Sequence, residues 1–393
     1  MKLPILKAQT RLKSLSPSRY NMAVTCPARA LWGRVLPPSG LPTSPAAVLG
    51  LAFHEVVEAV NLGRVSGDEA GIRAEAGRVF DLKAQTQMDA AHPLLRAKFP
   101  SPLRLPYYNQ KRAGALMQAV RRTVPSAPTA LSSGVAASFS SSSSEHGVGR
   151  IVEEKFYSRD GLLDGKPDCF ETSTGLLIDY KSGAAPEGGG ISPNEARQLR
   201  FYAHLLRENG HTPREAVIVR ADGQEARLTI SAQEAAEVGE DARRVLAQLN
   251  NTIDAAKRIE ETATPSPQNC SRCMFVSICP AFWEAASPDW SNATANDGSA
   301  EIVHVEGAVI SAASGGTRGG GLTTLQIDVR RGTGPRGAAS LEQVPDSWLC
   351  CDGDVLPKVG DEVRVTGVAL RPEAASPTVL RVGQTKAATV WTL

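Results

Sequence analysis

The sequence predicts an α/β protein in which helices flank a central mixed sheet, followed by a smaller all-β region. Three observations lead to this prediction. Residues 44–123 show helical periodicity, and residues 150–230 alternate short strands with one well-capped helix. Residues 301–393 contain only short alternating strands between Gly- and Pro-rich turns. A chain of 393 residues with 42% hydrophobic content is long enough to bury two cores.

The bulk composition sets few limits on function. The net charge of +2 neither favours nor excludes a nucleic-acid partner, because a basic cleft can form in a balanced chain. No apolar run approaches the roughly 20 residues of a membrane span, and the basic N-terminal segment lacks the long apolar stretch of a secretory signal. We therefore expect a cytoplasmic protein without a membrane partner, whose seven cysteines are thiols or metal ligands.

The N-terminal part is predicted to become helical after an irregular start. Prolines interrupt residues 1–40, which we expect to lack regular structure. Ser44 and Pro45 then form an N-cap and first-turn pair for a helix that ends at Gly63. The Ser-rich stretch 126–149 has no periodicity and is predicted to be a flexible insertion. Two further helices are expected, at 68–91 and 108–123.

The middle of the chain alternates strands with a capped helix. The strand-like segments are "RIVEEKFYS", "GLLDGKPDCFE", "GLLIDYKSG", "EAVIVRAD" and "EARLTI". After the third of them, Ser192 and Glu195 match a capping box that begins a helix ending at Gly210. A long helix is expected at about 231–262, followed by a Cys-rich segment at 270–279.

The last part of the chain differs in character from the rest. Five short strands without a helix signal between them indicate a small β-barrel of the OB type. We therefore predict a first domain at 1–290, a linker at 291–300 and an OB-like barrel at 301–393. Such a barrel binds either single-stranded nucleic acid or another protein, and its candidate strand contacts are Arg330, Arg331, Arg336 and Trp348.

The segment "GKPDCFETSTGLLIDYKSG" places three charges in a predicted β-hairpin. Alternation puts Asp179 and Lys181 on one face of the second strand. A two-residue loop at 173–174 pairs position 168 with 179, so that Asp168 and Asp179 face each other, whereas a longer loop with a bulge at Gly175 would shift the register. Because opposed carboxylates repel, we expect a cation between them, supplied partly by Lys181 and partly by a divalent ion.

Two carboxylates and a lysine suit the hydrolysis of phosphodiester bonds. Carboxylate oxygens hold Mg²⁺ or Mn²⁺, the ion lowers the pKa of a bound water, and the lysine orients that water for attack. The bare pattern also occurs in unrelated chains as a solvated hairpin with a salt bridge. Further residues are needed to choose between these interpretations.

The motif "GKPD…LIDYKSG" resembles the catalytic core of the PD-(D/E)xK nuclease superfamily, in its RecB-like branch. The resemblance implies a restriction-endonuclease-like core with metal ligands at Asp168, Asp179 and the backbone carbonyl of Tyr180. It also implies that Lys181 assists the attacking water. The stretch "LGLAFHEVVE" is similar to the branch's upstream helix, which implies that His54 joins the metal site.

Two more segments are similar to the same branch. The stretch "QLRFYAHLL" resembles its Q-x-x-x-Y helix, which places Gln198 and Tyr202 on one helical face as supporting or substrate-binding residues. The stretch "RIVEEKFYS" offers Glu153 and Glu154 where family members carry an acidic residue, and we select Glu154. The resemblance thus implies a metal-dependent nuclease acting on single-stranded DNA or DNA ends, in DNA repair, recombination or defence.

Two other functions stay open at this stage. One is a non-catalytic nucleic-acid-binding subunit with the nuclease fold, and the other is a subunit that docks to a helicase. Asp168, Asp179 and Lys181 are all present, which argues against a site that has lost its activity. The sequence leaves open endonuclease or exonuclease action, its polarity, and the choice between DNA and RNA.

Four cysteines form a second candidate site. The pattern Cys270-x2-Cys273-x5-Cys279 together with Cys26 supplies four thiolates, which suit Zn²⁺ or an iron–sulfur cluster. This split arrangement resembles the iron–sulfur staple of AddB-type and CRISPR-adaptation-type nucleases. The resemblance implies a [4Fe–4S] cluster, with Zn²⁺ as the alternative. The three other cysteines are expected to be packing residues: Cys169, Cys350 and Cys351.

Overall fold

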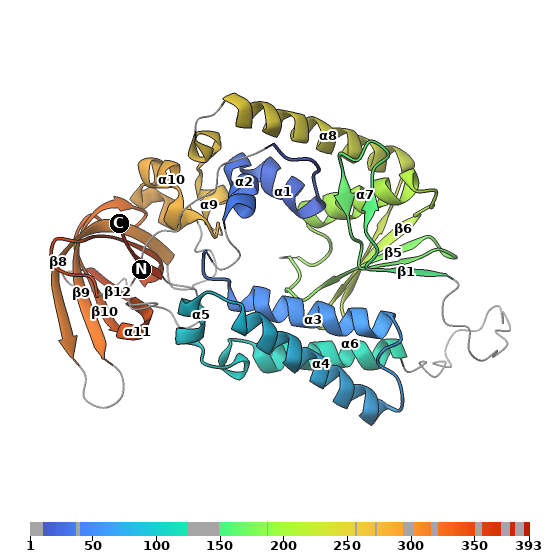
Figure 1. Ribbon diagram of the computed structural model, residues 1–393, viewed down its shortest axis with the longest axis horizontal. Helices are drawn as coiled ribbons and strands as arrows, with labels where there is room; N and C mark the ends of the chain where they lie inside the picture. The colour runs from blue at the N-terminus through green and yellow to red at the C-terminus, as the bar shows by residue number, and fades with distance from the viewer. Residues whose placement is uncertain are drawn as a thin grey trace.

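The computed structural model describes most of the chain (Figure 1). Most of the predicted Ser-rich insertion, most of the predicted linker, and both Cys350 and Cys351 lie outside the described residues. The described ranges are 11–36, 40–123, 149–186, 188–255, 258–271, 273–293, 302–315, 321–349, 356–370, 378–381 and 389–393.

Two short helices correct the prediction of an irregular N-terminal segment. Helix α1 (Pro17–Thr25) and helix α2 (Pro27–Val35) lie within it. Both begin at a proline, and a proline at the first helical position loses no hydrogen bond because its missing N–H would have no partner there. The prolines therefore start helices here instead of breaking them.

Three long helices form one layer of the protein, as the sequence predicted. The hydroxyl of Ser44 accepts a hydrogen bond from the backbone N–H of Ala47 and so caps the first of them. None of the helices in the described residues combines the length and apolar character of a membrane span. The layer consists of α3 (Pro45–Asn61), α4 (Glu69–Asp89) and α6 (Tyr108–Thr123), with the short α5 (Pro93–Lys98) and η1 (Pro102–Arg104) between the last two.

A mixed five-stranded sheet lies beside this layer (Figure 1). Its order is β1-β4-β5-β6-β7, in which only β5 and β6 are parallel. Two predicted strands are each split in two, and their other halves pair as β2 (Phe156–Tyr157) and β3 (Asp164–Gly165). The sheet strands are β1 (Arg150–Val152), β4 (Cys169–Glu171), β5 (Leu176–Lys181), β6 (Glu215–Arg220) and β7 (Glu225–Thr229).

Strand β5 separates two apolar cores. Ile178 and Tyr180 pack with α3, α4 and α6, whereas Leu177 packs with α1, α2, α7 (Pro193–Glu208) and α8 (Ala232–Ala255). The predicted capping box at Ser192 and Glu195 is present at the start of α7. Because both faces of the strand are covered, its register fixes which side chains enter which core.

The segment after α8 consists of short helical turns. The helix predicted to reach residue 262 ends at Ala255, because the backbone of Arg258 is extended and starts a separate turn. This segment contains η2 (Ile259–Thr262), α9 (Pro267–Cys270), η3 (Val276–Ile278), α10 (Pro280–Ala285) and η4 (Pro288–Ala293).

The described residues of the C-terminal part form β-strands and one turn of helix. Its strand order is β12-β10-β9-β8-β11-β13, and β12 also pairs with β11, so that five strands are joined pairwise into a closed ring. Strand β10 and helix α11 were not predicted, because "GAASLEQVP" lacks the apolar alternation of its neighbours. The elements are β8 (Ile302–Gly315), β9 (Leu322–Gly332), β10 (Gly337–Pro345), α11 (Asp346–Leu349), β11 (Glu362–Leu370), β12 (Thr378–Arg381) and β13 (Thr389–Thr392).

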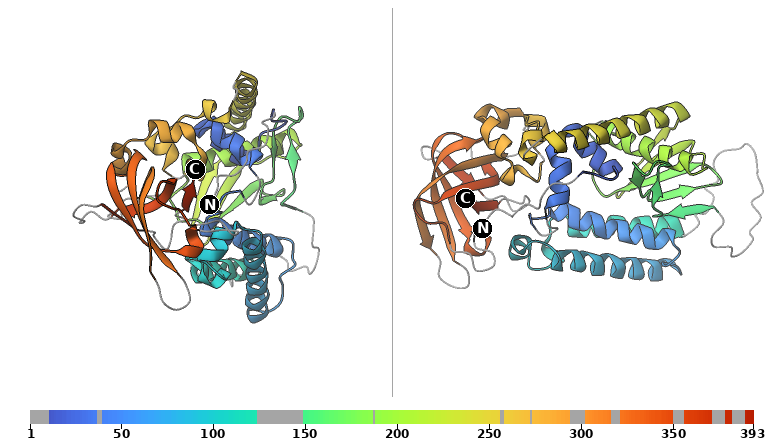
Figure 2. Two further views of the ribbon diagram at one scale, coloured as in Figure 1. Left: turned by 60° about the vertical axis from the view of Figure 1, so that its left-hand side comes forward. Right: turned by 45° about the horizontal axis from the view of Figure 1, so that its top comes forward.

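The C-terminal strands pack on the Cys-rich segment (Figure 2). The Arg364 guanidinium lies 5.2 Å from the ring centroid of Trp283 and donates a 3.0 Å hydrogen bond to the carbonyl of Ser277. Trp391 of β13 is 1% exposed and belongs to the same apolar core as α1 and α2. These contacts hold the ring of strands against the segment that carries three of the four candidate cysteines.

Two helical glycines, Gly114 in α6 and Gly33 in α2, allow a test of how closely α6 packs on the sheet. A Cβ at Gly114 would lie 2.7 Å from the carbonyl oxygen of Ala221, whereas a Cβ at Gly33 would meet only Phe275, at 3.9 Å. We expect Gly114→Ala to destabilise the protein by about 1–3 kcal/mol through overpacking. Gly33→Ala should stabilise it by up to about 1 kcal/mol, because alanine favours the helix. Unfolding of both variants in denaturant checks this pair, and equal stabilities would contradict the described packing.

Candidate metal centre

The hairpin between β4 and β5 has the predicted register. Cys169 lies opposite Ile178 and Glu171 opposite Leu176, which continues to a pairing of position 168 with 179. The loop is longer than predicted, because the N–H of Gly175 donates a 2.9 Å hydrogen bond to the carbonyl of Glu171. Gly175 adopts a φ of +72°, a left-handed conformation that glycine accepts without strain. The longer loop keeps the register, so the predicted facing of the two aspartates is retained.

Both aspartates are withdrawn from solvent. An Oδ2 atom of Asp168 accepts a 2.7 Å hydrogen bond from the backbone N–H of Tyr180. Asp179 is only 2% exposed, and its Oδ2 lies 2.8 Å from Lys181 Nζ. That contact is an ion pair without hydrogen-bond geometry, so Asp179 Oδ2 is a buried oxygen with no hydrogen-bond donor among the described residues. A carboxylate oxygen in this state is ready to accept a cation.

Helix α7 supplies the group that joins the lysine to the aspartate. Lys181 Nζ donates a 3.0 Å hydrogen bond to Gln198 Oε1, and Gln198 Nε2 donates one of 3.2 Å to Asp179 Oδ1. Gln198 Nε2 also lies 3.4 Å from the hydroxyl of Tyr202, one turn further along the helix. The structure therefore brings Gln198 and Tyr202 to the two charges, on the helical face that the sequence indicated.

Helix α3 brings a histidine to the opposite side of the site. His54 Nδ1 lies 3.6 Å from Asp168 Oδ2. A Cβ at Gly50, one turn earlier, would lie 3.2 Å from Ser182 Oγ, so a small residue lets the helix approach the end of β5. Burial lowers the pKa of His54, although the charge of Asp179 opposes this shift. A neutral imidazole is the form that binds metal ions.

Glu153, and not the selected Glu154, joins the acidic group. His54, Glu153 and Asp168 each place one potential ligand atom within 4.8 Å of the others. The backbone of Glu153 has a φ of +52°, which is unfavourable by roughly 1–3 kcal/mol for a residue other than glycine. A 3.3 Å hydrogen bond from its N–H to the carbonyl of Asp168 and an ion pair with Lys166 hold this conformation. Glu154 is exposed, and the alternation pattern did not indicate the bend in the backbone that separates the two glutamates.

The electrostatics of the site favour a bound cation. Burial, followed by the charge of Asp179, raises the pKa of Asp168 well above its ordinary value. Burial also raises the pKa of Glu153, with Lys166 opposing the shift. Carboxylate oxygens with an imidazole nitrogen suit Mg²⁺ or Mn²⁺, and a divalent ion would offset the repulsion between the acids. The residues present thus fit a divalent metal ion.

The four candidate cysteines come together from distant parts of the chain. Cys26 lies between α1 and α2, where its sulfur accepts a 3.5 Å hydrogen bond from the N–H of Thr264. Burial raises the pKa of Cys270 to about 11 and that of Cys279 to about 12. The neighbouring charges of Cys26 and Cys273 raise both pKa values further, which reflects the closeness of the four thiols. Cys169 is buried in the sheet and takes no part in this group.

Comparisons with known proteins agree with this geometry. Residues 14–280 match the profile of the family described as PD-(D/E)XK nuclease superfamily. That range includes the sheet, its flanking helices, the acidic centre and all four clustered cysteines. A search of curated proteins found no match.

The raised pKa of Asp168 predicts a pH-dependent penalty in the metal-free protein. Below about pH 3.9 the Asp168 carboxyl is neutral in both the folded and the unfolded chain, so it does not affect the free energy of unfolding. As the pH rises from there through the raised folded pKa, this carboxyl lowers the free energy of unfolding. Asp168→Asn should therefore raise the midpoint of thermal unfolding by a few degrees at pH 7 and leave it nearly unchanged at pH 3.5. The exposed Asp289→Asn is the control. A lower midpoint for Asp168→Asn at pH 7 would contradict the described burial.

Proposed function

Because the chain belongs to the PD-(D/E)XK nuclease superfamily, we propose that it is a metal-dependent deoxyribonuclease that hydrolyses phosphodiester bonds in single-stranded DNA or at DNA ends. The observation that supports this most directly is the meeting of Asp168, Asp179 and Lys181 at one end of the β4–β5 hairpin. DNA repair, recombination and defence are the processes that need such an activity.

The divalent ion of this proposal would be held by the oxygen-rich side of the centre. Its ligands would be Asp168, Asp179, His54 and the backbone carbonyl of Tyr180, with Glu153 taking the supporting position first assigned to Glu154. The buried Oδ2 of Asp179 is the structural reason for including that residue, because it has an ion pair with Lys181 but no hydrogen-bond donor among the described residues. A bound Mg²⁺ or Mn²⁺ would lower the pKa of a water molecule and stabilise the charged transition state.

The chain's own groups position the remaining reactants. The Lys181 side chain is one-quarter exposed, so its ammonium can reach a water molecule or a phosphate. An ion pair with Asp179 and a hydrogen bond to Gln198 keep the ammonium in place. Gln198 uses both ends of its amide, one on Lys181 and one on Asp179, and so fixes the spacing of the two charges. Tyr202 in turn lies within 3.4 Å of Gln198 and limits its rotation. This pre-arrangement lowers the reorganisation that the reaction requires.

The non-catalytic alternatives make a different use of the same fold. A subunit that only binds nucleic acid or docks to a helicase has no need for a buried aspartate paired with a lysine. Burying such charges costs free energy. The intact constellation of Asp168, Asp179 and Lys181 therefore favours an active nuclease.

For the four cysteines we propose a [4Fe–4S] cluster with a structural role. The resemblance of Cys26, Cys270, Cys273 and Cys279 to the iron–sulfur motif of AddB-type and CRISPR-adaptation-type nucleases supports this choice over Zn²⁺. A bound cluster would tie α1 and α2 to the segment after α8.

For the C-terminal residues 301–393 we propose an OB-like barrel behind a linker at 291–300, after a nuclease domain at 1–290. The ring order and the parallel pairing of β10 with β12 support this. The candidate strand contacts are engaged within the chain: Arg330 pairs with Glu362, Arg331 with Glu306, and Lys98 lies over the ring of Trp348. Arg336 donates to backbone carbonyls. These contacts favour a supporting role against the Cys-rich segment over strand binding at these residues.

The nuclease proposal predicts loss of cleavage without loss of folding. Asp179→Asn and Lys181→Ala should each reduce cleavage of end-labelled single-stranded DNA by at least about a hundredfold with Mg²⁺ or Mn²⁺ present, because each removes a group that acts in the transition state. Glu153→Gln should weaken cleavage, whereas Glu154→Gln, at an exposed position outside the acidic group, should not. Full activity of Asp179→Asn would refute the proposed centre.

The cluster proposal predicts colour and metal content. Protein purified without oxygen should be brown and contain iron and sulfide. Replacing any of Cys26, Cys270, Cys273 or Cys279 with alanine should remove the iron and lower the thermal midpoint, because cluster binding is linked to folding. Cys169→Ala is the control and should keep its iron. If metal analysis of the wild-type protein finds one zinc and no iron, the cluster proposal is wrong, although the four cysteines would still form a metal site.

A further inference from the structure

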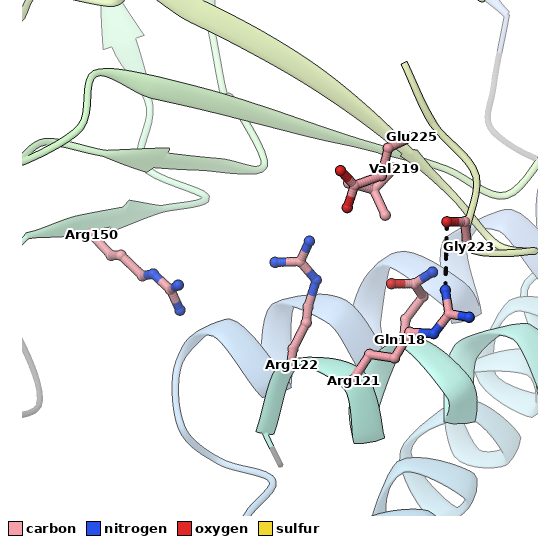
Figure 3. A pocket seen from close by; sticks show the side chains of 7 residues that line it. All are labelled: Gln118, Arg121, Arg122, Arg150, Val219, Gly223 and Glu225. Atoms are coloured by element: carbon pink, nitrogen blue, oxygen red, sulfur yellow. Dashed lines mark hydrogen bonds between the residues drawn. The ribbon is translucent and has the colours of Figure 1, made fainter. Parts of the chain in front are cut away.

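A polar cavity lies on the side of the sheet covered by α6 (Figure 3). Its volume is about 300 Å³, and three of the side chains that line it are arginines. Arg121 and Arg122 come from the last turn of α6, and Arg150 comes from the start of β1. Figure 3 shows the three guanidinium groups projecting toward the space between α6 and the sheet. The remaining lining residues are Gln118, Val219, Gly223 and Glu225.

Arg122, the central arginine, has no carboxylate partner among the described residues. The guanidinium of Arg122 lies 4.5 Å from the ring centroid of Tyr180. Its Nε atom is buried and has no hydrogen-bond partner among the described residues. A cation–π contact orients a guanidinium, but it leaves the N–H groups unsatisfied. A buried donor without a partner is unfavourable, so this arginine gains from binding an acceptor.

The other charged groups leave the cavity positive. Arg121 makes one long contact, 3.5 Å from Nη1 to the carbonyl of Gly223, and has no acidic partner in the described part of the chain. Arg150 pairs with Glu171 at 2.8 Å. The one acidic lining residue, Glu225, is paired at 3.3 Å with Arg227. Within the described ranges, two of the three arginines therefore have no acidic partner and are available to an anion.

This cavity is distinct from the acidic centre. Side chains alternate along β5, so Tyr180 and Arg122 lie on the α6 side of the sheet while Asp179 and Lys181 lie on the α7 side. The residues that line the cavity include none of the proposed metal ligands, so a ligand bound there would not contact the metal centre.

We propose that Arg121, Arg122 and Arg150 form a second phosphate-binding site. Guanidinium groups present paired N–H donors that match phosphate oxygens, and three of them around a small polar cavity favour a phosphate over a single carboxylate. The phosphate has two sources: a backbone phosphate of a nucleic acid held away from the cleavage centre, or a free phosphate such as inorganic phosphate. Both use the same chemistry. The proposal goes beyond the nuclease activity and does not depend on it.

Titration calorimetry of the full chain in EDTA tests the site without interference from the metal centre. The probes are inorganic phosphate and a short oligonucleotide that lacks terminal phosphates. We expect Arg122→Gln and Arg121→Gln each to weaken phosphate binding at least about tenfold, since each removes a charge-assisted contact. Arg104→Gln removes an exposed charge from the same helical layer and should change nothing. Arg122→Lys keeps the charge over Tyr180 and should bind with intermediate strength, and thermal unfolding checks that each variant is folded.

The results distinguish a nucleic-acid phosphate from a free phosphate, and they also show whether the proposed phosphate site is wrong. If the oligonucleotide competes with phosphate for the wild-type protein and itself binds more weakly to Arg122→Gln, the site holds a nucleic-acid backbone. If phosphate binds and the oligonucleotide does not compete, the site takes a free phosphate. If neither probe binds more weakly to folded Arg122→Gln than to Arg104→Gln, the arginines only cover Tyr180 and the proposal is wrong.

Discussion

The repulsion between two buried carboxylates is the constraint on which the candidate site depends. Asp168 and Asp179 face each other at one end of a hairpin, where burial and mutual charge raise the pKa of Asp168. A fold keeps such an arrangement only if something nearby compensates for it. Here the compensation comes from the Tyr180 N–H on one aspartate and from Lys181 on the other, and a divalent ion would complete it.

The rest of the fold holds that hairpin rigidly. Strand β5 lies between two apolar cores, so it cannot shift by one residue without moving Ile178 and Tyr180 out of one core and Leu177 out of the other. Helix α7 positions Gln198 from one side, and helix α3 positions His54 from the other. The ring of C-terminal strands lies away from this centre and packs on the Cys-rich segment through Arg364 and Trp391. The candidate metal centre at the hairpin is therefore separate from the C-terminal strands and the Cys-rich segment on which they pack.

Period-two alternation and helical spacing predicted how several side chains of the candidate site lie relative to one another, whereas the resemblance to a nuclease family suggested their roles. They put Asp179 and Lys181 on one strand face, opposed Asp168 to Asp179, and placed Gln198 and Tyr202 one turn apart. Alternation failed where the backbone leaves regular structure: at Glu153, which has a positive φ, the chain places Glu153 and not Glu154 beside Asp168. It also failed at α1 and α2, whose prolines start helices, and at β10, whose residues lack a pattern. The arginine cavity joins segments on either side of the Ser-rich stretch, so only the folded chain reveals it.

The central claim is that the opposed aspartates form a divalent-metal site. Its most direct test is a titration of the purified protein with Mn²⁺, followed by electron paramagnetic resonance, comparing the wild-type chain with Asp179→Asn. We predict saturable binding to the wild-type chain and its loss in the variant, because the buried Oδ2 of Asp179 is the oxygen without a hydrogen-bond donor. Equal Mn²⁺ binding by the two proteins would contradict the claim, since the metal would then bind somewhere other than between the aspartates.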